Sequence, residues 1–207
     1  MQHEVGRLPN NTSVGILALQ GDFLEHSNLL KALKVDVIEV RNSRELSEVD
    51  SLIIPGGEST TIAKLLDVYD LRQPIIEFAG NGRPVWGTCA GMILLAGSLI
   101  EPEPSPLKLM NTVVQRNAFG RQVNSFSTKI KFTGISGGMF EAIFIRAPYV
   151  VKANSGVDVL SRLDDDTIVA VRENNLLATA FHPELTKDCR VHDYFVRMTI
   201  ESMKQNG

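Results

Sequence analysis

Strand-like and helix-like segments alternate through the N-terminal half, and this alternation restricts the fold more than any other feature of the sequence. The strand patterns are short, apolar and β-branched, and the helix patterns repeat apolar residues at helical spacing. The strand patterns cover 13–20, 35–40, 49–57 and 83–88, and the helix patterns cover 22–33, 60–66, 73–79 and a stretch beginning near 90. Strands joined by such helices need parallel crossovers. We therefore expect an α/β fold, with an open, mostly parallel twisted sheet and helices on both faces.

The C-terminal half has a different pattern. A proline-rich segment at 101–107 is expected to be a surface loop, and short β-branched runs follow it. These runs, expected to be additional strands and several of them antiparallel, cover 109–115, 127–132, 142–147, 157–163, 167–173 and 176–181. A closing helix is expected at 190–204. No linker divides the chain, so residues 13–207 are expected to form one domain after a disordered extension at 1–12.

Two helix faces can be predicted from the spacing of apolar residues. The first helix pattern is expected to bury a broad face formed by Phe23, Leu24, Leu29, Leu30 and Leu33. The closing helix is expected to bury a face formed by Val191, Phe195, Met198 and Met203.

Charge and cysteine usage exclude several classes of partner. The formal net charge is −3, and no basic stripe or polybasic segment is present to bind nucleic acid or a membrane surface. No stretch approaches 18 uninterrupted apolar residues. The chain has two cysteines and no signal-peptide pattern, which predicts a reducing, cytoplasmic setting without disulfides.

The segment "GTCAG", Gly87 to Gly91, places Cys89 between a strand and a helix. This is the Gly-x-Cys-x-Gly form of a nucleophile elbow, in which glycines permit a sharp turn and close packing. The positive end of the helix dipole favours a thiolate there, and the N–H of Ala90 can donate to a developing oxyanion. The alternative is a buried structural thiol, because free cysteines are often buried in proteins that catalyse nothing.

His182 is the best candidate for a base that activates Cys89. It follows a strand pattern and begins "HPEL", so that an extended chain would place Glu184, two residues on, on the same side as the imidazole. A base and an orienting carboxylate are what a cysteine nucleophile needs. His26 and His192 are expected on polar helix faces, and Cys189 with His192 lacks the further ligands of a zinc site. No metal is expected.

A second glycine turn, in "IIPGGESTT" from Ile54 to Thr61, also ends a strand and opens a helix. It lacks the lysine and spacing of a P-loop, so it is not expected to bind nucleotide phosphate. The amides of Gly56 and Gly57 can face a ligand, with Glu58 and Ser59 adding polar contacts. The alternative is a tight turn in which Ser59 or Thr60 caps the next helix.

These motifs resemble a known family. "PGGEST", "GTCAGM" and "HPEL", in this order, resemble the class I (triad) glutamine amidotransferases, whose fold is flavodoxin-like. "LALQGDFLEH", "RNAFGRQ" (Arg116 to Gln122) and "FIRAP" (Phe144 to Pro148) more narrowly resemble the glutaminase subunit of pyridoxal 5'-phosphate synthase, the PdxT/SNO family. The similarity runs from about Ser13 to the C-terminal helix.

The resemblance implies a glutaminase that converts L-glutamine to L-glutamate and ammonia through a thioester on Cys89, with His182 as base and acid and Glu184 orienting it. It needs no cofactor, and its ammonia passes to a separate synthase subunit on which its activity depends. The implied glutamine contacts are Gly57, Glu58, Ser59, Arg116, Ile145 and Arg146. The implied oxyanion donors are the backbone amides of Gly57 and Ala90, and Gln20 and Gly21 are implied to lie near both the active site and the docking surface.

Three other functions share part of this pattern. A glutaminase subunit of histidine or purine synthesis would share the triad but would not need "RNAFGRQ" and "FIRAP". A binding or regulatory subunit would keep the fold with a missing or misplaced triad member. A cysteine hydrolase acting on other small molecules or peptides would leave the "PGGEST" and arginine motifs without a role.

Overall fold

The computed structural model describes residues 12–116 and 125–206 of the 207-residue chain. Most of the expected extension at 1–12 and most of the "RNAFGRQ" motif therefore lie outside the described residues. Thr12 is described, and it is buried.

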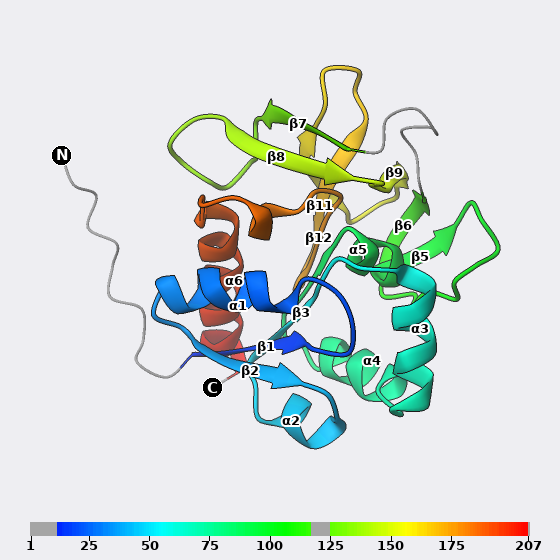
Figure 1. Ribbon diagram of the computed structural model, residues 1–207, viewed down its shortest axis with the longest axis vertical. Coiled ribbons are helices and arrows are strands. Elements are labelled where there is room, and N and C mark those ends of the chain that lie inside the picture. Colours follow the sequence, from blue (N-terminus) through cyan, green and yellow to red (C-terminus); the bar gives the residue numbers. More distant parts are fainter. Residues whose placement is uncertain (1–11, 117–124, 207) are drawn as a thin grey trace.

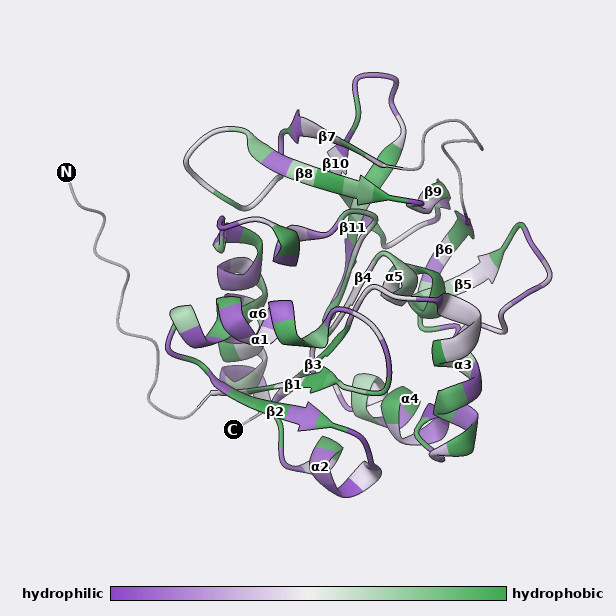
Figure 2. Ribbon diagram, in the orientation of Figure 1, coloured by the Kyte–Doolittle hydropathy of each residue, from purple (hydrophilic) through white to green (hydrophobic). Residues whose placement is uncertain are grey.

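Five parallel strands form one side of the main sheet and hold the candidate site. In spatial order they are β2 (Asp36–Val40), β1 (Ser13–Leu17), β3 (Ser51–Ile54), β4 (Val85–Thr88) and β12 (Leu176–Thr179). Every residue of β3, β4 and β12 is buried, as expected for strands covered on both faces. The arrowhead of β1 is green (hydrophobic) in Figure 2, in keeping with the four buried residues of this strand.

The sheet continues beyond β12 through mainly antiparallel strands. In spatial order these are β11 (Ile168–Glu173), β9 (Tyr149–Ala153), β6 (Met110–Gln115) and β5 (Ala96–Leu99), and β10 (Asp158–Arg162) pairs with β11. β5 and β6 pair in parallel. A separate antiparallel ribbon joins β7 (Ser125–Ile130) to β8 (Phe140–Ile145). The expected α/β fold, with a parallel sheet and additional antiparallel strands, is confirmed.

Helices cover both faces of the sheet (Figure 1). α1 (Phe23–Ala32) and α6 (Arg190–Asn206) lie on one face, and α3 (Ser59–Val68), α4 (Arg72–Gly80) and α5 (Ala90–Leu95) lie on the other. The short helix α2 (Ser43–Ser47) follows β2, and a 3-10 turn, η1 (Pro183–Leu185), precedes α6. No helix within 12–116 or 125–206 is long and apolar enough to cross a membrane.

The buried apolar side chains form one cluster to which both halves of the chain contribute. Its largest members include Trp86 from β4, Phe140 and Phe144 from β8, and Phe195 from α6. The face of α6 is buried as expected, except that Met203 is 38% exposed. The expected face of α1 is right in part: Leu30 is buried and Phe23 and Leu33 pack against the core, but Leu24 is exposed, and His26 and Ser27 are buried.

Besides η1, three elements were not predicted from the sequence patterns. The helix α2 has only five residues and begins at Asn42, whose side chain accepts a hydrogen bond from the Glu45 amide (3.0 Å). β5 has the sequence "AGSL", which lacks β-branched residues. β9, "YVVKA", contains two valines and directly follows Pro148, and no strand was expected there.

Candidate active site

Cys89 occupies a strained turn between β4 and α5. Its backbone has φ 47° and ψ −100°, a conformation that non-glycine residues rarely adopt. The flanking glycines are required by close packing, because a Cβ on Gly87 would overlap the backbone of Gly91, and a Cβ on Gly91 would overlap the carbonyl oxygen of Ile54. The turn therefore has the geometry of a nucleophile elbow.

Strand pairing brings the histidine to this elbow. β12 runs parallel to β4 with Thr179 opposite Thr88, and the amide of Cys89 donates to the Thr179 carbonyl oxygen (2.8 Å). His182 follows three residues after Thr179, and its amide donates to the carbonyl of Ile143 in β8 (2.8 Å). Cys89 and His182 thus meet at the carboxyl end of the parallel strands, where ligands bind in such sheets.

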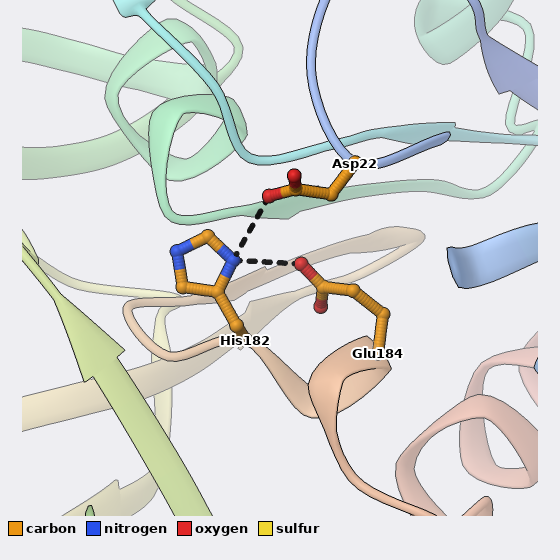
Figure 3. Close-up of side chains that lie close together, drawn as sticks. All are labelled: Asp22, His182 and Glu184. Atoms are coloured by element: carbon orange, nitrogen blue, oxygen red, sulfur yellow. Dashed lines mark hydrogen bonds and ion pairs between the residues drawn. The ribbon is translucent and has the colours of Figure 1, made fainter. Parts of the chain in front are cut away.

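His182 and Glu184 form a buried pair. The Nδ1 atom of His182 lies 2.7 Å from Oε1 of Glu184, and both residues are 4% exposed (Figure 3). The contact agrees with the sequence hypothesis, but the expected extended backbone was wrong. The chain turns here, because Pro183 opens the 3-10 turn η1, and this turn carries the carboxylate back to the ring.

Asp22 is a second carboxylate at the same imidazole, and sequence reasoning missed it. Its Oδ2 lies 3.4 Å from His182 Nδ1 (Figure 3). Burial lowers the pKa of His182, but hydrogen bonds with the two carboxylates and the Cys89 thiol outweigh it and raise the pKa to about 12. Burial raises the pKa of Glu184, against the hydrogen bond from His182. Both shifts favour a proton held between Nδ1 and Oε1, which leaves Nε2 to face the thiol.

The glycine loop of "PGGEST" packs against this site. A Cβ on Gly56 would overlap the ring of His182, and the amide of Glu58 donates to Gln20 Oε1 (2.8 Å). Glu58 itself caps α3 by accepting from the amides of Thr60 (3.1 Å) and Thr61 (2.7 Å), so the cap is neither Ser59 nor Thr60. Burial opposes ionisation of Glu58, but these hydrogen bonds lower its pKa to about 2.

Two of the residues expected to contact glutamine, Gly57 and Ser59, lie in this loop. Gly57, with φ 155°, packs against the Gln20 side chain, and Ser59 is 4% exposed at the start of α3. Gly21 is close enough to Gly56 that any side chain there would overlap its carbonyl, and the Asp22 amide donates to that carbonyl oxygen (3.1 Å). The segment after β1 and the glycine loop are therefore locked together.

Arg116 lies between the glycine loop and the proline-rich loop. Its Nη2 is 3.7 Å from Glu58 Oε1, its Nη1 donates to the carbonyl of Glu103 (2.6 Å), and its amide donates to Glu101 Oε2 (3.1 Å). The side chain is 20% exposed. The proline-rich loop, expected only at the surface, thus helps to hold Arg116 beside the site.

The remaining residues expected to contact glutamine, Ile145 and Arg146, lie at the end of β8. The Cys89 thiol donates to the carbonyl oxygen of Ile145 (3.8 Å), so Ile145 reaches the nucleophile. Arg146 is exposed and has φ 44°. No described contact joins its guanidinium to the triad.

Asp22, His182 and Glu184 also satisfy the distance criterion for a metal site, because one donor atom from each lies within 4.8 Å of the others. We interpret the cluster as a proton-holding site, because an Nδ1–H that donates to a carboxylate leaves no lone pair there for a metal.

Comparison with known proteins assigns the family. The SNO glutamine amidotransferase family matches residues 16–201. The chain belongs to this family. It is 57% identical over 187 residues to the pyridoxal 5'-phosphate synthase subunit PdxT of Dehalococcoides mccartyi, covering 89% of this chain and 96% of that protein. It is 52% identical to the PdxT subunit of Herpetosiphon aurantiacus, covering 89% and 98%.

A solved structure supports the same assignment. A crystal structure described as a glutamine amidotransferase superposes with a TM-score of 0.85 at 45% identity, covering 90% of this chain and 98% of that one. A structure described as that of a GMP synthase subunit from Thermoplasma acidophilum superposes with a TM-score of 0.69 at 15% identity, covering 94% and 97%, which shows a shared fold alone.

This SNO family member contains two buried histidines where polar helix faces were expected, and that expectation was wrong. His26 on α1 and His192 on α6 are both 0% exposed. Burial lowers the pKa of His192 to about 3, and burial together with nearby histidines lowers the pKa of His26 well below 6.5. Their spacing could have revealed them: His26 shares a helix face with Leu30, four residues on, and His192 shares one with Phe195 and Val196, three and four residues on.

Proposed function

We propose that this chain is a glutaminase that hydrolyses L-glutamine to L-glutamate and ammonia and delivers the ammonia to a separate pyridoxal 5'-phosphate synthase subunit. The observation that carries the chemistry is the strained Cys89 turn facing the His182–Glu184 pair. The relatives at 57% and 52% identity, both named as PdxT subunits of pyridoxal 5'-phosphate synthase, support the substrate and the partner.

In the first half of the reaction, His182 Nε2 takes the thiol proton and the Cys89 sulfur attacks the carboxamide carbon of glutamine. The raised pKa of His182 favours this transfer. The backbone amides of Ala90 and Gly57 are the proposed donors to the oxyanion. The N–H of Ala90 belongs to the first turn of α5, where helical amides have no partner within the helix.

Collapse of the tetrahedral intermediate breaks the carbon–nitrogen bond. As this bond breaks, His182 gives the proton on Nε2 to the leaving nitrogen, so that ammonia departs and a thioester remains on Cys89. In the second half, His182 removes a proton from water, the water oxygen attacks the thioester carbon, and the carbon–sulfur bond breaks. Glutamate is released and the thiol regains its proton. Throughout, Glu184 holds Nδ1 and keeps the ring oriented.

The same geometry suits the two charged groups on the α-carbon of glutamine. We assign the α-carboxylate to the Arg116 guanidinium, with Arg146 as an outer cation, since guanidinium binds carboxylate strongly. We assign the α-ammonium to Glu58, whose lowered pKa keeps it ionised, and to the carbonyl of Ile145. Ser59 and Gly57 line the remaining wall of the glycine loop.

Gln20 and Gly21 are proposed to couple partner docking to the site, because the Gln20 side chain bonds the Glu58 amide of the glycine loop. We propose that residues 13–207 act as a single glutaminase domain. We also propose a cytoplasmic location, because both cysteines are free and the nucleophile requires a reduced thiol. Cell fractionation tests the location.

Ammonia release from glutamine, measured with and without the synthase subunit, tests the function. The paired chain is expected to release ammonia, Cys89→Ala to abolish release, and Cys189→Ala, the matched change at the other cysteine, to leave it unchanged. Full turnover by Cys89→Ala would overturn the mechanism. Stimulation by a histidine or purine synthase instead would overturn the partner, although the GMP synthase neighbour is too distant in sequence to favour that alternative.

A further inference from the structure

Behind the His182–Glu184 pair lies a second layer of buried polar groups that the mechanism above does not use. His26 Nδ1 is 2.9 Å from His192 Nε2. On its other side, His26 Nε2 is 3.2 Å from Thr88 Oγ1 and 3.4 Å from Glu184 Oε2. All four residues are at most 4% exposed. The layer therefore connects the rear oxygen of the triad carboxylate to α1, β4 and α6.

The positions of the protons in this layer follow from which atoms have partners. Both histidines are neutral, because burial lowers their pKa values, so each carries one N–H. Among the described residues His192 Nδ1 has no hydrogen-bond partner. A buried N–H without an acceptor costs more than a bare ring nitrogen, so the proton of His192 belongs on Nε2, from which it donates to His26 Nδ1.

His26 must then carry its own proton on Nε2. That N–H donates to Thr88 Oγ1, and the same nitrogen lies 3.4 Å from Glu184 Oε2, a close electrostatic contact that falls outside hydrogen-bond geometry. The opposite tautomer would leave a donor of His192 unpaired and would turn a bare nitrogen lone pair toward the carboxylate oxygen. Two independent contacts therefore select the same direction for the whole chain of donors, from His192 through His26 to Glu184.

We propose that His26 is a positioning residue of the active site: its Nε2–H holds the Glu184 carboxylate ionised and oriented, and His192 fixes the tautomer that makes this possible. The inference rests on the proposed glutaminase function. Glu184 needs such a group because its side-chain hydrogen bond to His182 uses Oε1, whereas Oε2 is buried without a hydrogen-bond partner among the described residues and has His26 Nε2 at 3.4 Å.

The groups around Glu184 explain why it needs the N–H of His26 in addition to the hydrogen bond from His182. Burial and the negative charge of Asp22 both favour the neutral acid, whereas His182 favours the carboxylate. The N–H on His26 Nε2, which also faces the Thr88 hydroxyl, further favours the ionised form of Glu184. Without it, Glu184 would take up a proton at higher pH and would no longer accept the Nδ1–H of His182.

The test compares His26→Leu with His26→Gln in the complex with the synthase subunit. Leucine removes the N–H, whereas a glutamine amide can place a donor where Nε2 lies. We expect His26→Leu to lower kcat about tenfold with little change in KM, because it removes the N–H beside a buried carboxylate oxygen that has no hydrogen bond of its own. The acid limb of the kcat/KM profile should move up by about one pH unit, and His26→Gln should restore both in part.

Two controls separate positioning from loss of packing. Phe195→Leu, beside Trp86 in the same core, should lower Tm and leave the pH profile unchanged. A second measurement needs no variant: the ¹⁵N shifts of the wild-type imidazoles should show His26 protonated at Nε2 and His192 also at Nε2. A proton on His26 Nδ1, or a wild-type pH profile in His26→Leu, would overturn the proposal.

Failure of the proposed function has a different result. If the wild-type complex releases no ammonia, or if Cys89→Ala retains release, the glutaminase proposal is wrong. If release depends on Cys89 and the His26→Leu profile is unchanged, only the role of His26 is wrong.

Discussion

Acidification should destabilise this protein through His192, and the size of the effect can be worked out from its burial. His192 is fully buried, and burial lowers its pKa from 6.5 to about 3. A histidine whose pKa is lowered by folding contributes its full stability above about pH 6.5 and loses it as the pH falls. At pH 5 the unfolded chain binds a proton that the folded chain excludes. This one group should then reduce the free energy of unfolding by about 2 kcal/mol relative to pH 7.

The assay is urea unfolding of wild type and His192→Phe at both pH values. Phenylalanine removes the titrating group, and its loss of the bond to His26 lowers stability at both pH values alike. The wild-type protein should therefore lose about 2 kcal/mol more than the variant between pH 7 and 5. Phe195→Leu, one turn further along α6, removes no ionisable group and should keep the wild-type dependence. Equal losses in wild type and His192→Phe would refute the reasoning.

Four further substitutions test the rest of the site. Glu184→Gln should lower kcat of the complex by about 10²- to 10⁴-fold in steady-state ammonia assays, because the ring loses its orienting carboxylate. Asp22→Asn should lower the pKa of the catalytic histidine and move the basic limb of the pH profile to lower pH; an unmoved limb would exclude this contact. Arg116→Ala should raise KM for glutamine about tenfold or more, with only partial recovery in Arg116→Lys. Gly91→Ala should reduce stability by about 1 to 3 kcal/mol in thermal melts, whereas Gly80→Ala, with open space around it, should not.

The parts of the fold and of the site that short local motifs determine could be predicted from the sequence. The parallel strands, the elbow at Cys89 and the neighbouring His182 and Glu184 all follow from short motifs whose glycines and proline leave little conformational choice. The SNO family match agrees with the resemblance found in those motifs. Their catalytic roles stay predictions until the substitutions are made.

What the sequence did not predict depends on contacts between distant segments. Asp22 reaches the imidazole only because the segment after β1 is locked to the glycine loop. His26 and His192 read as polar residues in isolation, and only the packing of α1 and α6 on one face of the sheet makes them a buried pair. The proline-rich loop likewise meets Arg116 through a backbone carbonyl, which no side-chain pattern encodes.

The pairing of β12 with β4 has a consequence for synthesis of the chain. The nucleophile directly follows β4. Its partner strand β12, which leads to His182, lies near the C-terminal end of the sequence, after most of the other strands. During translation, which exposes N-terminal segments first, Cys89 emerges long before the base that activates it. Cys89 therefore has no base to activate it while the chain is still being synthesised. A chain truncated before His182 would have an incomplete sheet and a thiol without its base.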